Sequence, residues 1–207
     1  MVNLSRRQFA SSAPLVLGAA SPLSACSQGS NPESYEAVAE QTRRTDPLVG
    51  IEGAVLSQEL VRYATLAPSS HNTQCWKFAL ETQAITMLAD RSRRCPAEDP
   101  DDHHVFVSLG CATENLAHAA LAHGLRAETY FDVAGETIRV ALVPTRAEVS
   151  PLFNAIPARQ CTRGDYDSKR LSTGELGLLE RAGTSDSVRM LLIAERPAVE
   201  RVLDFVV

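Results

Sequence analysis

Apolar and polar positions along the chain predict two helices in its first two thirds. In residues 57–67 apolar side chains recur at helical spacing, Ser57 is a suitable N-terminal cap, and Pro68 disfavours helical geometry before it. Residues 104–123 repeat the pattern with almost no charge, and Gly124 stands where a helix terminator belongs. The second helix is therefore expected to be buried over most of its surface.

Alternating apolar and polar residues predict two β-hairpins beside these helices. Residues 76–81 and 85–89 form the first pair of strands, and residues 126–133 and 136–143 form the second. Helix, hairpin, long helix and hairpin in this order indicate an α+β fold, in which an antiparallel or mixed sheet is flanked by helices.

The last quarter of the chain begins a further set of elements. Ser172 opens a capping box for a helix that ends near Gly183, residues 188–194 are predicted to form a strand, and Pro197 begins another helix. Val207 falls inside this last apolar pattern, without a cap or a polar tail. The second set of elements is therefore expected to be incomplete.

The first 26 residues have the pattern of an export signal. Arg6 and Arg7 lie in a stretch that resembles a twin-arginine motif, and residues 23–26 resemble a lipobox in which Cys26 is lipidated. The apolar run between them is too short and too polar to span a membrane. We expect an exported protein, periplasmic or anchored through Cys26 on the extracytoplasmic side of the membrane; simple cleavage near Ala25 is the alternative.

A polar stretch, residues 27–55, follows this signal and is broken by prolines. It is predicted to be a linker with a short helix near residues 35–41. Removing the signal takes away two arginines and no acidic residue, so the remaining body is acidic. Membrane attachment would then depend on the acyl chains alone.

Composition and residue spacing restrict the kinds of ligand and cross-link that the chain can be expected to have. The 207 residues carry a net charge of -5 with scattered basic side chains, which gives no reason to expect a nucleic-acid partner. The glycine fingerprints of Rossmann and P-loop nucleotide sites are absent from the sequence. No metal site is predicted, because the histidine and cysteine spacings fit no ligand pattern. The body cysteines stay unpaired or form one of three disulfide pairings; they are Cys75, Cys95, Cys111 and Cys161.

A run of neutral polar side chains separates the first helix from the first strand. Ser69, Ser70, Asn72 and Gln74 offer donors and acceptors that suit a flat heterocycle with carbonyl and N–H edges. No strong acid or base accompanies them, and no GxSxG elbow supports a hydrolase built on Ser70 and its histidine neighbour. No catalytic residue is predicted, and His71 is expected in solvent.

Two arginines offer the chemistry that a phosphate needs. Arg159 and Arg163 are four residues apart, so their guanidinium groups would share one face if residues 159–163 opened a helix. Two guanidinium groups on one face can bind a phosphate together. The alternative is that both arginines are simply solvated.

These segments together resemble the flavin-dependent nitroreductase superfamily. PSSHNTQCW is similar to its PSxxNxQPW signature, SLGCATENLAHAALAHGL to its central helix, and RQCTR to its RRSxR phosphate motif. Cys75 replaces the signature proline, and Cys161 replaces the motif serine. From about residue 56 to 166, the charged connection at 91–103 included, the chain is most similar to the Acg-type branch. That branch fuses two nitroreductase-like halves, which implies halves at 56–150 and 151–207, the second truncated.

The resemblance implies an FMN site shared between two walls. Ser69, Ser70, Asn72 and Gln74 would contact the isoalloxazine and ribityl groups, while Arg159 and Arg163 would bind the phosphate; Trp76 and Phe78 would anchor the loop in the core. Hydride would arrive from a nicotinamide dinucleotide and leave to a nitro, quinone-type or other electron-poor acceptor. A homodimer is compatible with such a site. The alternatives are an exported protein that binds or stores FMN without turnover, and an incomplete, inactive fragment.

Overall fold

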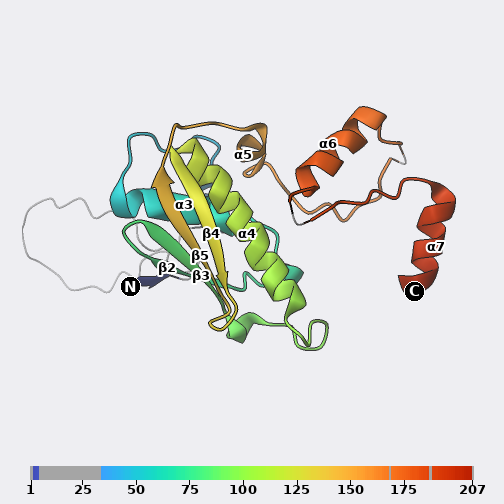
Figure 1. Ribbon diagram of the computed structural model, residues 1–207, viewed down its shortest axis with the longest axis horizontal. Helices are drawn as coiled ribbons and strands as arrows, with labels where there is room; N and C mark the ends of the chain where they lie inside the picture. Colours follow the sequence, from blue (N-terminus) through green and yellow to red (C-terminus); the bar gives the residue numbers. More distant parts are fainter. Residues whose placement is uncertain (1, 5–33, 168, 187, 207) are drawn as a thin grey trace, which may run out of the picture. The chain divides into compact units, whose positions relative to one another are not determined.

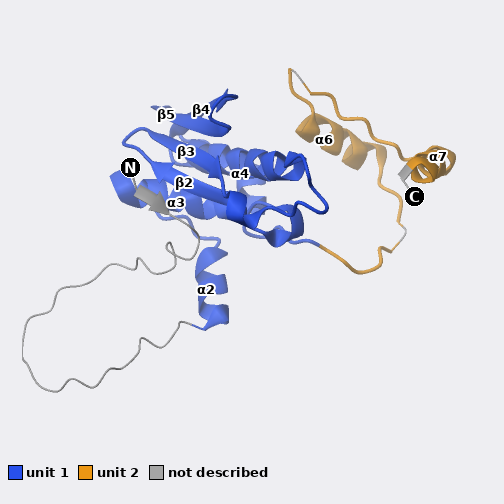
Figure 2. Cartoon of the chain, turned by 90° about the horizontal axis from the view of Figure 1, so that it is seen from below, with its two compact units in different colours: residues 1–161 blue, residues 162–207 orange. Residues whose placement is uncertain are grey.

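The computed structural model describes residues 2–4, 34–167, 169–186 and 188–206 of the chain. It divides into two compact units, residues 1–161 and residues 162–207 (Figure 2). The division lies eleven residues beyond the expected start of the second half at residue 151, because the short helix α5 (Pro151–Ala155) packs with the first unit. Phe153 and Ile156 are buried there, and the Phe153 ring lies 4.8 Å from that of Tyr63.

The first unit confirms the α+β class and both predicted hairpins. Its antiparallel sheet has the strand order β1-β2-β3-β5-β4 (Figure 1). The strands are β1 (Val2–Leu4), β2 (Trp76–Leu80), β3 (Ala84–Ala89), β4 (Leu125–Asp132) and β5 (Thr137–Pro144). β1, whose residues belong to the predicted export signal, pairs with β2, with Val2 opposite Leu80.

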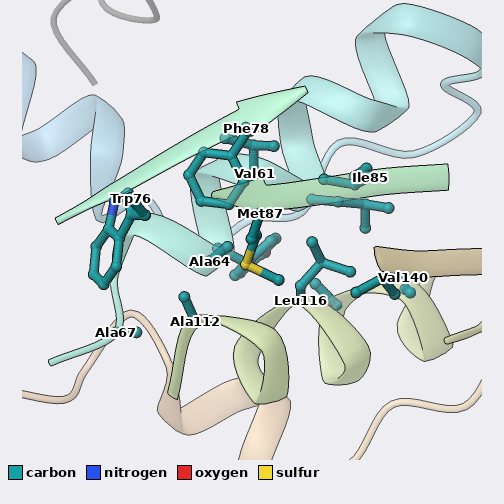
Figure 3. Close-up of a cluster of buried hydrophobic side chains, with 14 of the residues drawn as sticks. Val61, Ala64, Ala67, Trp76, Phe78, Ile85, Met87, Ala112, Leu116 and Val140 are labelled. Carbon is teal, nitrogen blue, oxygen red and sulfur yellow. The ribbon is translucent and has the colours of Figure 1, made fainter. Parts of the chain in front are cut away.

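Two helices, α3 (Gly53–Thr65) and α4 (His103–Ala122), cover one face of this sheet. Phe78, Met87 and Ile138 lie opposite one another on neighbouring strands, so their side chains share that face. They pack with Val61 of α3 and Leu116 of α4 in a single core (Figure 3). Burial of these aliphatic and aromatic side chains is the main stabilising contribution to the unit.

The predicted start of α3 was wrong. The helix begins at Gly53, and Ser57 lies inside it, where its hydroxyl donates to the Gly53 carbonyl at 3.2 Å. A serine within a helix satisfies its hydroxyl in this way at little cost, so it need not mark an N-terminus. Glu59, two residues further along, is buried and pairs with Arg62.

The long helix α4 ends as predicted but starts with a cap from further away. Gly124 follows it with φ of 75°, a conformation that glycine adopts at no steric cost. At the other end the buried Asp99 carboxylate accepts from the backbone N–H groups of His104 and Val105. By length and composition α4 could cross a membrane, but in the structure it is the core helix of the unit.

The stretch predicted to be a linker contains the expected short helix, α2 (Tyr35–Thr42), capped by Ser34. The charged connection at 91–103 contains a short 3-10 turn, η2 (Arg91–Arg93). Its Asp102 is buried and pairs with Arg91 and Arg94, so part of the connection is tied to the core rather than solvated.

The second unit contains two helices, α6 (Thr173–Gly183) and α7 (Arg196–Val206). The predicted capping box is confirmed, because the Ser172 hydroxyl accepts from the Glu175 N–H while the Glu175 carboxylate accepts from Ser172. The predicted strand at 188–194 was wrong. A strand needs a neighbour for its backbone groups, and no other segment among the described residues of this unit is paired as a strand.

Arg6, Arg7 and Cys26 lie outside the described residues, so the export motif and the lipidation site stay predictions. The four described cysteines form no disulfide with one another; Cys75 is buried and Cys161 is exposed.

Candidate functional site

The polar loop, residues 66–75, runs from the C-terminus of α3 to the start of β2 and makes a tight turn of its own. The turn is a 3-10 segment, η1 (Ser70–Asn72), closed by backbone hydrogen bonds from Asn72 to Ser69 and from Thr73 to Ser70. His71, Asn72 and Gln74 have φ of 48°, 53° and 54°. Asparagine tolerates this left-handed region, but each of the other two residues costs about 1–2 kcal/mol there. Such strain persists only where neighbouring groups hold the backbone.

Three side chains supply that support. The Ser70 N–H donates to the hydroxyl of Ser108 on α4 at 3.2 Å, and the Gln74 N–H donates to the Ser69 hydroxyl at 3.0 Å. The guanidinium of Arg93, from the charged connection after β3, donates to the Thr73 carbonyl at 2.8 Å. The loop is thus fixed by its own serine, by the core helix and by the connection that precedes that helix.

The four predicted cofactor residues of the loop lie close together but differ in exposure. Ser69 and Ser70 are half-buried, and Asn72 is exposed. Gln74 is only 8% exposed, and its amide donates to the Asn72 side-chain oxygen at 3.1 Å. Its own carbonyl oxygen Oε1 is buried and has no partner among the described residues. A buried acceptor without a donor is costly, which marks this atom as one that a ligand could satisfy.

Trp76 and Phe78 have the predicted anchoring role, since each is 2% exposed in the core behind the loop (Figure 3). Cys75, which replaces the signature proline, is buried and gives its carbonyl to the N–H of Asp90 at 2.9 Å. This bond to the end of β3 fixes the junction between loop and strand, where a proline would otherwise restrict the backbone. His71 is exposed, as expected.

Arg159 comes back to the foot of the polar loop from 93 residues further along the chain. Its Nε and Nη2 atoms donate to the Leu66 carbonyl, the first residue of the loop, at 3.3 and 2.9 Å. Leu66 is the C-cap of α3, so the positive guanidinium lies at the negative end of a helix dipole, which is favourable. Arg159 and the polar loop, which the resemblance assigns to one site, are therefore neighbours in the first unit.

The remaining contacts of Arg159 leave part of its guanidinium available. Nη1 donates to the Cys161 sulfur at 3.4 Å, so three of the five N–H groups of a guanidinium are used within the first unit. The other two lie on the terminal nitrogens, the pair that can bind an anion. On the facing helix, burial raises the pKa of the Cys111 thiol, and the positive charge of Arg159 opposes that rise.

The second predicted phosphate residue has a different setting. Arg163 is exposed and belongs to the second unit, so its part in the site stays a prediction. Residues 159–163 are not helical, so the condition under which both arginines would share a helix face is not met. After α5 the chain turns at residues 156–158 and then continues through Gly164 without helix or strand pairing.

An apolar groove of about 330 Å³ lies elsewhere in the first unit, between α4 and the β4–β5 hairpin. Phe106, Gly110, Thr113, Thr129, Phe131 and Ile138 line it, and none of these is a predicted cofactor residue. The polar loop instead presents Pro68, His71 and Asn72 at the surface, as one open wall.

Sequence reasoning missed the groups that hold this wall. Ser108 stands in the helix segment that carried the resemblance, yet its hydroxyl acts on a loop 38 residues earlier. Arg93 lies in the charged connection, where one arginine among several gives no signal of its own. The Leu66 carbonyl is a backbone atom, which side-chain patterns cannot reveal.

Among known protein families, no family model matches the chain. Over 123 residues it is 28% identical to two proteins of Mycobacterium tuberculosis, from strains CDC 1551 / Oshkosh and ATCC 25618 / H37Rv, both provisionally named NAD(P)H nitroreductase. The match covers 56% of this chain and 36% of each relative, so the chain spans about a third of the length of the curated relatives it matches. These distant similarities support a place in the nitroreductase superfamily.

Proposed function

We propose that this chain binds FMN and acts as a nitroreductase-like oxidoreductase, which takes hydride from a nicotinamide dinucleotide and reduces a nitro, quinone-type or other electron-poor acceptor. The names of the two mycobacterial relatives support the nicotinamide and the general reaction. The sequence resemblance supports FMN and the class of acceptor.

One observation carries the proposal: Arg159 lies on the Leu66 carbonyl, beside a loop rich in neutral polar groups. This places a cation and a set of neutral donors and acceptors within one small region. FMN has the matching parts, a phosphate at one end and a heterocycle with carbonyl and N–H edges at the other. The buried Oε1 of Gln74 lacks a donor among the described residues, and an N–H of the heterocycle would supply one.

The residues divide the work of binding in this account. Arg159 would hold the phosphate, and the sequence resemblance assigns Arg163 to the same role. Ser69, Ser70, Asn72 and Gln74 would hold the polar edges of the ring system and the ribityl chain. Bound FMN supplies the hydride chemistry, so no acid or nucleophile of the chain is required. Ser108 and Arg93 hold the strained loop through their hydrogen bonds to the Ser70 N–H and the Thr73 carbonyl.

An absorption spectrum tests the proposal first. The purified chain is incubated with FMN, passed through a desalting column and examined for bound flavin absorbance, then for bleaching by NADH or NADPH without oxygen. Bound FMN that a nicotinamide bleaches is the expected result. Protein that retains no flavin would refute the proposal. Binding without nicotinamide oxidation across a panel of acceptors would replace the enzyme by an FMN-binding or FMN-storing protein.

A variant of Gln74 tests the role of the loop. Gln74→Leu removes the unpaired buried acceptor, so FMN affinity is expected to fall about tenfold while the stability changes by no more than about 1 kcal/mol. Gln83→Leu, at the exposed turn between β2 and β3, is the matched control and should change neither. Equal FMN affinity in both variants would remove the loop from the site.

We also propose that the chain is exported, on the strength of Arg6, Arg7 and Cys26. Replacing both arginines by lysine should retain the chain in the cytoplasm, and Cys26→Ser should abolish labelling by a fatty acid. Fractionation of expressing cells measures the first result, and unchanged export would contradict it.

A further inference from the structure

The stretch predicted to be a linker makes direct contact with the segment that carries Arg159. Arg43, the residue that ends α2, donates from its Nη1 atom to the Arg159 carbonyl at 3.0 Å and to the Pro157 carbonyl at 3.3 Å. These two contacts join parts of the chain more than a hundred residues apart. Both carbonyls belong to a stretch without helix or strand pairing of its own, so external donors fix its course.

An arginine of a buried ion pair on α3 fixes the backbone on both sides of Arg43. Arg62 on α3 is 1% exposed and pairs with Glu59, which is 2% exposed. The Nη1 atom of Arg62 also donates to the carbonyls on either side of Arg43, those of Thr42 at 2.9 Å and Arg44 at 3.3 Å. The backbone at Arg43 is thus attached to the core by its two neighbours, while its own side chain is exposed and turned to residues 157–159.

The contacts form a closed circuit that begins and ends on α3. Arg62 of α3 donates to the backbone carbonyl beside Arg43, and Arg43 donates to the carbonyl of Arg159. The Arg159 guanidinium in turn donates to the carbonyl of Leu66, the C-cap of α3. The Arg159 N–H donates to the Ala155 carbonyl at 2.9 Å. Both the main chain and the side chain of Arg159 are therefore fixed at the foot of the polar loop.

We propose that Arg43 is a positioning residue for the phosphate-binding Arg159, and that residues 42–44 support the cofactor site rather than forming part of a tether. This inference rests on the proposed FMN site. Arg43 acts on the backbone of Arg159 and does not itself touch the cofactor. Because the Arg43 side chain is exposed, its removal should leave the core intact and change only the placement of the segment that it holds.

The test compares FMN with riboflavin, which lacks the phosphate. For the wild-type chain, Arg43→Ala, Arg43→Lys and the control Arg126→Ala, the dissociation constants of both flavins are measured by fluorescence titration. Arg126 is an exposed arginine on β4 that pairs only with Glu128 in the described structure. We expect Arg43→Ala to weaken FMN binding about tenfold and leave riboflavin binding unchanged. Arg43→Lys should restore part of the loss, since an ammonium can donate to the same carbonyls without the fork.

A second readout needs no flavin at all. Amide hydrogen exchange at residues 158–161 should be at least about threefold faster in Arg43→Ala than in the wild type or in Arg126→Ala. Unchanged exchange would refute the statement that Arg43 fixes the backbone around Arg159. An equal loss of FMN and riboflavin affinity, or no loss of either, would refute the positioning role. If the wild type binds neither flavin, the proposed function and the phosphate binding by Arg159 are both refuted. The exchange data alone then decide whether Arg43 fixes the backbone around Arg159.

Discussion

The buried ion pair between Glu59 and Arg62 gives the sharpest quantitative prediction for the fold. Glu59→Gln removes a carboxylate that accepts from Arg62 Nε at 3.0 Å and Nη2 at 2.8 Å, and that also pairs with Arg44. The variant keeps one amide oxygen as an acceptor but turns an NH₂ group towards a guanidinium that is 1% exposed. Removing one partner of such a buried pair costs about 3–5 kcal/mol, because an uncompensated charge remains in the core.

Urea unfolding followed by tryptophan fluorescence measures this loss. Trp76 is the only tryptophan of the chain and is buried in the first unit, so the signal reports on that unit alone. We expect a lower midpoint at an unchanged slope, equivalent to about 3–5 kcal/mol. The control Glu128→Gln breaks the exposed pair with Arg126 and should cost less than about 1 kcal/mol. A loss for Glu59→Gln as small as that of the control would refute the burial and pairing described for α3.

Three further predictions concern pH, a turn and the loop. Burial raises the pKa of Glu59, but the hydrogen bond and charge of Arg62 outweigh this effect and hold the pKa below its ordinary 4.5. The ionised carboxylate therefore stabilises the fold fully above pH 4.5, and this stabilisation is lost as pH falls through the lower folded-state pKa. The difference in unfolding free energy between the wild type and Glu59→Gln should shrink only in that acidic range. Gly124→Ala, at φ of 75° and with its new Cβ 3.2 Å from the Thr145 carbonyl, should lower the unfolding free energy by about 1–2 kcal/mol in the same urea assay, and no loss would contradict the left-handed turn. Ser108→Ala should cost about 1 kcal/mol and weaken FMN binding severalfold in a fluorescence titration, because the Ser70 N–H loses its acceptor; an unchanged affinity would show that the loop needs no support from α4.

The hairpins and the long helix could be predicted because their signals are local. In β2 the alternation of Trp76, Lys77 and Phe78 places the apolar side chains on the face that the helices cover, and in α4 the apolar positions run up to Gly124. The capping box at Ser172 is likewise a contact between residues three apart. Signals of this kind lie within one element, and a single sequence contains them in full.

The errors have physical causes of a different kind. Ser57 could cap a helix or lie inside one, and its local sequence fits both; in the structure its hydroxyl donates to the Gly53 carbonyl within the helix. Residues 188–194 have strand-like composition, but a strand depends on a partner that propensity does not supply. The sequence places Arg159 and the polar loop in one site only through a family resemblance; the contact itself is made to a backbone carbonyl.

The part of the chain predicted to be a linker shows the same limit most clearly. Prolines and polar residues there suggested a tether, yet the structure attaches Thr42 and Arg44 to buried Arg62 through their carbonyls. Composition reports on side chains, whereas these attachments use the main chain. An arginine in a polar stretch can therefore be part of a site without any local signal.

The ratio of FMN to riboflavin affinity, in the wild type and in Arg159→Ala, tests most directly whether the polar loop and Arg159 bind one cofactor. Both flavins share the heterocycle that the loop would hold, and only FMN carries the phosphate that the guanidinium would hold. The account predicts a clear preference for FMN in the wild type, reduced by about tenfold or more in Arg159→Ala at unchanged riboflavin affinity. Equal affinities for the two flavins in the wild type, or a ratio that Arg159→Ala leaves unchanged, would contradict it.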